Sequence, residues 1–177
     1  MKPEKFKICI FGDGGVGKTT LVNRYLTGVF QEHYKITIGA DFFVKRINVN
    51  GATVTLQIWD FAGEDRFRFI LPSYIVGSSG CIFMFDITRY SSIRNLTDWM
   101  EVFYKGSKKY NKEIPIIMVG GKLDLDQKRS VMTNQATEFA EKHKFSHYIE
   151  CSSKTGENVN DIFESITKIM LEKRNLA

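Results

Sequence analysis

The chain is poor in cysteine and histidine, the residues that build disulfide scaffolds and zinc sites. Its three cysteines, Cys9, Cys81 and Cys151, lie far apart, and each falls in or next to an apolar stretch. The three histidines, His33, His143 and His147, show no metal-binding spacing. This pattern argues against a disulfide-stapled secreted domain and favours buried free thiols in a reducing compartment.

Long apolar runs are also missing. No segment approaches the ~20 apolar residues that a transmembrane helix needs, and Met1-Lys2-Pro3-Glu4-Lys5 leads into a strand-like stretch instead of a secretory signal. The chain ends Lys173-Arg174-Asn175-Leu176-Ala177 without a prenylation box, so either the protein carries no such lipid or the chain has been shortened. We expect a cytoplasmic protein, with peripheral association at the cytosolic face of a membrane left open.

A strong charge of one sign is absent as well. The net charge is +5, and the small basic clusters lie at 105–109 and 168–174. Solvated helix faces explain these clusters better than nucleic-acid binding does, although the second cluster can attract acidic lipid. With 177 residues, 43% of them hydrophobic, we expect one domain over 1–177.

What the chain does have is the run Gly12-Asp13-Gly14-Gly15-Val16-Gly17-Lys18-Thr19, which matches G-x-x-x-x-G-K-[ST] in full. A strand-like stretch, 5–11, precedes it, and a helix-like stretch, about 18–28, follows it. Glycines let backbone N–H groups surround an anion, the helix start adds unpaired N–H donors, and lysine adds a charge for the outer phosphates. A glycine-rich turn without a ligand is the alternative. The flanking elements favour a phosphate site built from Asp13, Gly14, Gly15, Val16, Gly17, Lys18, Thr19 and Thr20.

Strand-like and helix-like patterns alternate along the rest of the chain. Two alternating runs, Asp41–Asn48 and Thr53–Asp60, flank Asn50-Gly51, a strong hairpin signal. Further strands are expected at 80–86, 114–119 and 147–151, and helices at about 93–104, 133–143 and 159–173. Apolar strands that alternate with helices predict an α/β fold whose mostly parallel sheet is covered on both faces. Ligands of such sheets bind beyond the carboxyl ends of the strands, and every polar motif here follows a strand.

Two loops carry oxygen-bearing residues that suit magnesium. Asp60 ends a strand and can hold Mg²⁺ directly or through water, and the Thr19 hydroxyl can ligate it. Thr37, in the polar stretch Phe30–Gly39, is a natural second hydroxyl ligand. Alone, such an Asp is usually a cap or turn residue; downstream of a phosphate loop we predict the ligands Thr19, Thr37 and Asp60 (via water). A loop that reaches the metal only when a γ-phosphate is present acts as a switch.

A candidate base pocket follows two later strands. In Gly120-Gly121-Lys122-Leu123-Asp124, Asp124 can accept hydrogen bonds from the N1–H and N2–H edge of guanine, which adenine cannot supply. Losing such a charge-assisted pair costs about 1.5–3 kcal/mol, and the Lys122 methylenes can lie along the base plane. Ser152, Ser153 and Lys154 can complete the pocket. Solvated loop residues are the alternative for both segments.

Together these motifs resemble the Ras superfamily of small GTPases, and within it the Rab family, over essentially the whole chain. Rab-like stretches are Thr37–Phe42, Leu56–Asp60, Arg66–Arg68 and Phe85–Thr88. The resemblance implies a P-loop NTPase (Ras-like) fold with a six-stranded, mostly parallel sheet, one antiparallel strand and about five helices on both faces. It also implies bound GTP or GDP with Mg²⁺, Phe30 packed on guanine, and catalytic roles for Lys18, Thr37, Gly63 and the residue at position 64.

The resemblance further implies a monomer that acts in membrane trafficking and binds proteins, not nucleic acid. Its exchange factor, GTPase-activating protein and effectors would bind through Phe30–Gly39, through Phe61–Tyr74, and through a surface trio of Phe42, Trp59 and Tyr74. An exposed apolar cluster of this kind fits a partner site. A partly buried packing cluster is the alternative.

Three positions depart from the family pattern. Gly121 stands where the family has an Asn that ties the base to the phosphate loop, so we expect weaker binding or faster exchange. Glu64 replaces the Gln that orients the attacking water. A carboxylate cannot donate to phosphoryl oxygens and adds negative charge, so we predict slow intrinsic hydrolysis. The segment Tyr74-Ile75-Val76-Gly77-Ser78 lacks the usual Rab arginine, which loosens the assignment within the superfamily only.

Two functions remain after this reasoning. One is a GTP-hydrolysing switch, and the other is a nucleotide-dependent protein-binding module in which Glu64 has removed turnover. A kinase or ATPase on the same scaffold is disfavoured, because Asp124 favours guanine and no lid of clustered arginines is evident.

Overall fold

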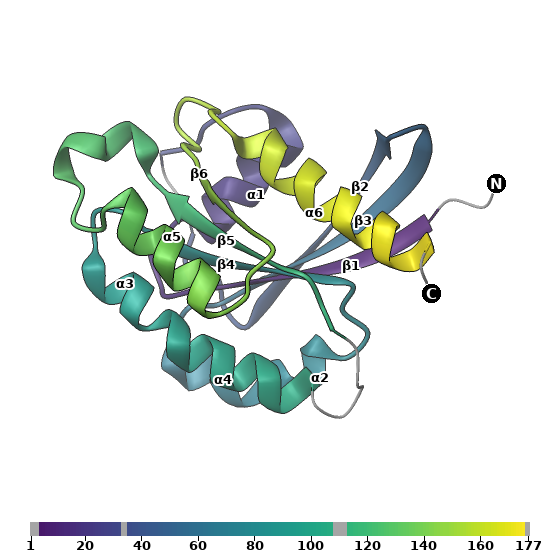
Figure 1. Cartoon of the computed structure of the whole chain (residues 1–177), viewed down its shortest axis with the longest axis horizontal. Coiled ribbons are helices and arrows are strands. Elements are labelled where there is room, and N and C mark those ends of the chain that lie inside the picture. The colour runs from purple at the N-terminus through teal and green to yellow at the C-terminus, as the bar shows by residue number, and fades with distance from the viewer. Residues whose placement is uncertain (1–3, 33–34, 108–112, 176–177) are drawn as a thin grey trace.

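Six strands form one central sheet in the computed structural model, which describes residues 4–32, 35–107 and 113–175. The strand order is β2-β3-β1-β4-β5-β6, and every neighbouring pair is parallel except β2 with β3 (Figure 1). The strands are β1 (Glu4–Phe11), β2 (Ala40–Val49), β3 (Ala52–Phe61), β4 (Gly80–Asp86), β5 (Ile116–Gly121) and β6 (His147–Glu150). The predicted α/β fold with one antiparallel strand is confirmed.

The hairpin between β2 and β3 follows directly from its two-residue turn. Asn50 and Gly51 have φ angles of 50° and 79°, as a type I′ turn requires. Val49 pairs with Ala52, which fixes the register of the whole hairpin. The predicted turn is therefore confirmed, and β2 becomes an edge strand of the sheet.

Six α-helices lie in the described part of the chain, one more than the expected number of about five. The predicted helix at 93–104 is divided at Asn95 into α3 and α4, and the five-residue α2 lies in a segment where the sequence predicted no helix. A helix of this length shows no usable apolar periodicity. The helices are α1 (Lys18–Thr27), α2 (Leu71–Ile75), α3 (Tyr90–Arg94), α4 (Leu96–Ser107), α5 (Thr133–Lys142) and α6 (Val159–Asn175), with 3₁₀ segments at Asp65–Ile70 and Leu123–Lys128.

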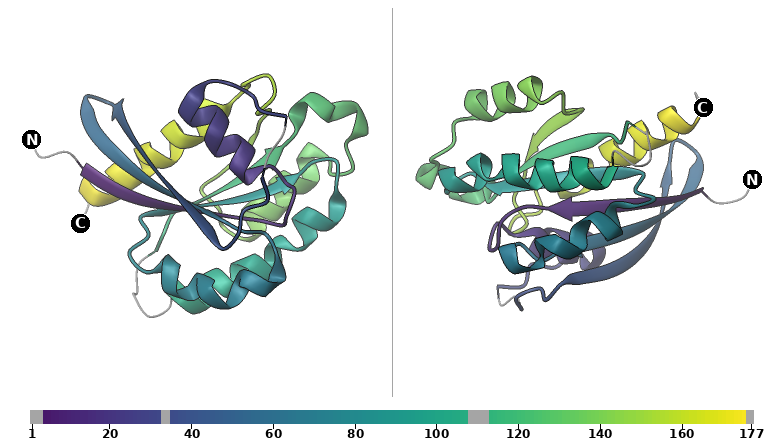
Figure 2. Two further views of the ribbon diagram at one scale, coloured as in Figure 1. Left: turned by 180° about the vertical axis from the view of Figure 1, so that it is seen from behind. Right: turned by 90° about the horizontal axis from the view of Figure 1, so that it is seen from below.

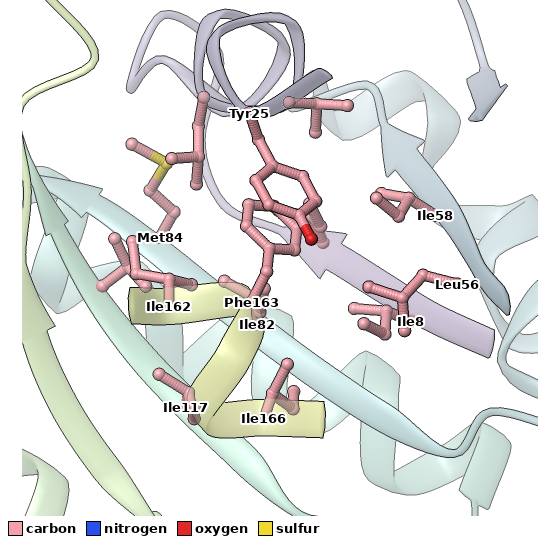
Figure 3. Close-up of a cluster of buried hydrophobic side chains, with 14 of the residues drawn as sticks. Ile8, Tyr25, Leu56, Ile58, Ile82, Met84, Ile117, Ile162, Phe163 and Ile166 are labelled. Atoms are coloured by element: carbon pink, nitrogen blue, oxygen red, sulfur yellow. The ribbon is translucent and has the colours of Figure 1, made fainter. Parts of the chain in front are cut away.

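The sheet separates two apolar cores. Side chains alternate along β1, so Ile8 and Ile10 face α1 and α6, whereas Cys9 and Phe11 face α2 to α5. Figure 2 shows these helices on opposite sides of the sheet. In the first core the rings of Tyr25 and Phe163 stack with centroids 3.9 Å apart (Figure 3). Both cores pack against β1, so the loop that follows β1 begins from a firmly held strand.

The cysteine prediction is also confirmed: Cys9, Cys81 and Cys151 are free and buried. Burial raises the pKa of the Cys9 thiol to about 11 and that of Cys151 to about 12. Within residues 4–32, 35–107 and 113–175, no helix combines the length and apolarity needed to cross a bilayer.

Candidate functional site

The glycine-rich loop joins β1 to α1 at the carboxyl edge of the sheet, and its shape depends on missing side chains. Gly12 has a φ of 150°, and a β-carbon there would lie 2.1 Å from the Met84 carbonyl oxygen. Gly17 has a φ of 101° and precedes α1 without any side-chain cap. The N–H groups of the first turn of α1 are therefore left for a ligand, and the helix dipole favours an anion there.

Lys18 is buried within this loop, with 6% of its surface exposed. Its Nζ donates to the carbonyl oxygens of Gly12 and Asp13, both at 2.8 Å. Burial lowers the pKa of Lys18 to about 8, against the opposing attraction of Asp60 and Asp13. The ammonium is still mainly protonated at neutral pH, so a positive charge with one remaining donor lies at the mouth of the loop.

Three oxygen-bearing side chains from three separate segments meet beside Lys18. The Thr19 hydroxyl lies 2.7 Å from the Thr37 hydroxyl and donates to Asp60 Oδ2. Asp60 is fully buried, and its Oδ1 atom has no hydrogen-bond partner among the described residues. Burial raises the Asp60 pKa to about 6.

This donor set fits a small, hard divalent cation. All of its donor atoms are oxygen, the element that Mg²⁺ prefers. Within the part of the chain that the structure describes, Asp60 Oδ1 is buried without a hydrogen bond, and a bound cation would stabilise it. The structure thus brings Thr19, Thr37 and Asp60 together, as the sequence predicted. Their binding of a metal stays a prediction. Residues 33 and 34 of the predicted loop Phe30–Gly39 lie outside the described residues.

The loop opens onto an elongated cleft. Its first part has a volume of about 260 Å³ and is lined by Gly14, Lys18, Thr19, Thr37 and Glu64, among others. Its second part, of similar volume, is lined by Phe30, Lys122, Asp124, Ser153 and Lys154, among others. Gly15, Gly17 and Thr20 line both parts, so the two form one continuous groove. The groove brings most of the predicted phosphate, metal and base residues together at the carboxyl ends of the strands; Asp13, Asp60 and Ser152 do not line it.

Lys122 and Asp124 are held in place at the second part of the groove. Lys122 Nζ donates to the Gly15 carbonyl oxygen at 3.0 Å and pairs with Asp86 Oδ2 at 2.7 Å. Burial alone would raise the Asp86 pKa, but hydrogen bonds from Lys122 and Thr88 outweigh it and lower the pKa. Asp124 is exposed at the surface, and its Oδ1 accepts a hydrogen bond from the Ser152 hydroxyl at 2.7 Å. Ser152 is therefore a buried support of Asp124 and does not itself line the groove.

The end of β3 is pressed against the glycine-rich loop. The Gly63 carbonyl accepts a hydrogen bond from Gly14 N–H at 3.1 Å, and a β-carbon on Gly63 would lie 2.2 Å from that nitrogen. Glu64 follows at the rim of the groove, where its Oε2 pairs with Arg66 Nε at 2.7 Å. The carboxylate at position 64 thus faces the groove as a paired, partly exposed group.

The Asp13 side chain turns away from the groove, which the sequence did not reveal. Its two carboxylate oxygens accept hydrogen bonds from the Trp99 indole N–H and the Asn95 amide, both at 2.8 Å. The Arg68 guanidinium lies over the Trp99 ring, 4.4 Å from the ring centre. Asn95 directly precedes α4 and Trp99 lies in its first turns, but nothing in their spacing names Asp13 as their partner.

Arg89 is a second residue that the sequence analysis missed. Its guanidinium donates to the Gly14 carbonyl oxygen at 2.8 Å, which fixes the outer side of the glycine-rich loop. Together with Asn95 and Trp99, it ties the loop to the helices on the second face of the sheet.

The predicted aromatic trio does assemble on the surface. The Phe42 and Trp59 rings lie 4.8 Å apart, and the Trp59 and Tyr74 rings lie 5.3 Å apart. Phe42 is 47% exposed, whereas the other two are half-buried. The cluster is thus partly a packing cluster and partly an exposed apolar surface.

Comparison with known proteins agrees with this site. The sequence model of the Ras family matches residues 7–172. The chain is 37% identical over 168 residues to the Ras-related protein Rab-19 of Xenopus laevis, covering 95% of this chain and 78% of that protein. It is 38% identical over 172 residues to the Ras-related protein Rab7 of Drosophila melanogaster, covering 97% and 83%. It is 36% identical over 173 residues to the Ypt/Rab-type GTPase ypt7 of Schizosaccharomyces pombe, covering 97% and 84%. The chain therefore belongs to the Ras family of small GTPases and is similar to its Rab members.

Proposed function

We propose that this protein is a guanine-nucleotide-dependent switch that binds GTP and GDP with Mg²⁺ and hydrolyses GTP slowly. The observation that carries the proposal is the continuous groove, which has the buried Lys18 ammonium at one end and the Asp124 carboxylate at the other. A triphosphate would lie against Lys18 and the N–H groups at the start of α1, and a guanine would meet Asp124 and the Lys122 stem.

In this proposal the metal is held by the hydroxyls of Thr19 and Thr37, with Asp60 acting through a bound water. A bound Mg²⁺ would neutralise phosphate charge. Thr37 belongs to a segment whose neighbours Ile36 and Ile38 are 71% and 76% exposed. Because few apolar contacts hold that segment, its position depends on what Thr37 binds, which is the property that a switch needs.

Hydrolysis requires a water to be oriented near the outer phosphate, and position 64 lies at that rim. Glu64 can accept a hydrogen bond from such a water, but its negative charge opposes the charge that develops on the phosphoryl oxygens. The Arg66 guanidinium, 2.7 Å away, also occupies one oxygen of the Glu64 carboxylate in an ion pair. A low intrinsic rate is the expected consequence.

Partners are proposed for the loops that respond to nucleotide. Exchange factor, activating protein and effectors would contact Phe30–Gly39, Phe61–Tyr74 and the trio of Phe42, Trp59 and Tyr74. The exposed Phe42 ring supports this. We further propose that the protein is one domain, acts as a monomer, works in membrane trafficking as the Rab relatives suggest, and is located in the cytoplasm or peripherally on the cytosolic face of a membrane.

The central experiment is mass spectrometry of the nucleotide that co-purifies with the native protein, followed by titration with GDP, GTP and ATP in the presence of Mg²⁺. Bound guanosine di- or triphosphate and a preference for guanine over adenine are expected. Absence of micromolar binding of either guanine nucleotide would remove the proposal. Equal affinity for ATP would remove the role of Asp124 and revive a kinase or ATPase function.

A second candidate function is a nucleotide-dependent binding module with negligible turnover, and the Glu64–Arg66 ion pair favours it. Single-turnover GTP hydrolysis by the unaltered protein and by Glu64→Gln separates the two candidates. We expect Glu64→Gln to raise the rate, and Arg66→Gln serves as a control that removes the pair but keeps the carboxylate. A Glu64→Gln rate that is unchanged or lower would refute the electrostatic argument.

A further inference from the structure

Met84 occupies an unusual place below the base end of the groove. It comes from β4, is 1% exposed, and extends toward α1 (Figure 3). A β-carbon built on Gly121 would lie 2.5 Å from the Met84 methyl carbon, Cε. Gly121 is not among the described residues with positive φ, so its backbone conformation does not demand glycine. The methionine methyl group takes the space beside residue 121 and would have to move to admit a side chain there.

The same methyl group also reaches the glycine-rich loop. It would lie 3.6 Å from a β-carbon on Gly17, and the Val16 carbonyl oxygen would lie 3.3 Å from the β-carbon on Gly121. Met84 therefore fills the space between the end of β5 and the loop, where a side chain on residue 121 would otherwise lie. It is also one of the residues that line the second part of the groove, along with Phe30, Lys122 and Asp124.

We propose that Met84 and Gly121 are a complementary pair that gives the base pocket an apolar floor, so that guanine is recognised along the edge facing Asp124 and receives no side-chain hydrogen bond at N7. This inference rests on the proposed binding of guanine nucleotides. With the phosphates on the loop and the N1–H and N2–H edge on Asp124, the imidazole-ring edge of the purine passes over the stretch between them. That stretch is lined by Met84, with Gly121 buried behind it, and neither residue has a side chain that can donate a hydrogen bond.

The nearest cation does not replace the missing donor. Lys122 Nζ already donates to the Gly15 carbonyl oxygen and pairs with Asp86 Oδ2, at 3.0 Å and 2.7 Å. These two contacts direct its ammonium group toward the loop and β4 and leave its methylene stem for the base plane.

The first test needs no variant. The affinity of the unaltered protein for GDP is compared with its affinity for 7-deaza-GDP, in which a C–H group replaces the N7 acceptor, by calorimetry with Mg²⁺ present. We expect the two affinities to agree within about twofold, because no hydrogen bond is lost. A loss of about fivefold or more with 7-deaza-GDP would overturn the inference. Failure to bind GDP at all would instead overturn the proposed function, and this inference with it.

The second test rebuilds the pocket. Gly121→Asn alone forces the Met84 methyl group toward the groove and should weaken GDP binding. Met84→Val with Gly121→Asn removes the obstructing Sδ and Cε atoms, so the amide can reach N7, and GDP should then bind about three- to tenfold more tightly than 7-deaza-GDP. Met84→Val alone is the matched control, because it makes room without adding a donor, and should show no such preference.

Thermal denaturation of each variant establishes that it is folded. A folded double variant that still treats the two ligands alike, or a Gly121→Asn single variant that binds GDP more tightly than the unaltered protein does, would show that Met84 and Gly121 are not a pair.

Discussion

The two ends of the groove are built from different parts of the chain. At the phosphate end, main-chain segments lie directly against one another. β-Carbons built on Gly12 and Gly63 would lie 2.1 Å and 2.2 Å from main-chain atoms of the neighbouring segment. At the base end, side chains do the fitting, since Met84 fills the space beside Gly121 and Ser152 supports Asp124. A substitution changes a side chain and leaves the main-chain atoms as they are. Contacts between main-chain atoms therefore cannot be rebuilt by substitution, whereas two side chains in contact can change together. This contrast agrees with a phosphate motif that is kept in full beside the departure at position 121 that the resemblance implies.

The largest expected effect tests the phosphate end. Lys18→Ala removes the buried ammonium and its charge-assisted contacts, so we expect affinity for GTP and GDP to fall by more than about a hundredfold. Lys154→Ala removes an exposed lysine that lines the base end of the groove, and it should cost much less affinity than Lys18→Ala does, because the Lys154 side chain is not buried. Calorimetric titration measures both. Similar losses in the two variants would contradict the contrast between the ends.

Two glycines that touch each other give the next test. Gly63→Ala places a methyl group 2.2 Å from Gly14 N, so we expect a loss of about 1–3 kcal/mol or more in the free energy of unfolding, together with weaker nucleotide binding. Gly14→Ala is matched to it, because the nearest atom to its β-carbon is the Gly63 carbonyl oxygen at 3.9 Å. Urea denaturation of both variants gives the comparison. An equally stable Gly63→Ala would mean that the loop can shift, and that backbone does not fix this end.

At the base end we expect a change in selectivity instead of a general loss. Asp124→Ala removes the acceptor for the guanine edge, which should reduce the GTP over ATP preference by about tenfold to a hundredfold while ATP affinity stays nearly constant. Competition binding with both nucleotides measures this. Parallel losses for GTP and ATP would indicate that Asp124 supports the fold of the pocket and does not read the base.

The smallest expected effect concerns the support behind the phosphate loop. Trp99→Phe keeps the ring under Arg68 but removes the indole N–H that reaches Asp13. We expect a cost of about 0.5–1.5 kcal/mol in stability, because the half-buried Asp13 carboxylate loses one hydrogen bond. Faster GDP release should accompany it, measured by displacement of a fluorescent GDP analogue. Stability and GDP release that are both unchanged in Trp99→Phe would show that this hydrogen bond does not support the loop.

Much of this molecule was predictable because local patterns and tertiary needs agree. The 80–86 strand, the Asn50-Gly51 turn and the start of α1 at Lys18 follow from apolar runs, turn chemistry and the phosphate motif. The rule that ligands bind at strand ends places Lys18 and Asp124 along one groove, with the buried Asp60 in contact with Thr19 of its lining. The break of the predicted 93–104 helix at Asn95 and the short α2 escaped, because neither alters apolar periodicity over a long enough window.

The amino-acid sequence by itself determined the phosphate loop, the order of the strands along the chain and the residues that would line the groove, because these depend on glycine conformations, apolar periodicity and short spacings. Only the tertiary structure decided that Asp13 faces Trp99 and Asn95, that Arg89 holds Gly14, and that the Met84 methyl group takes the space beside Gly121. These contacts join segments far apart in the chain, and their partners are chosen by the packing of the two cores and not by any local pattern.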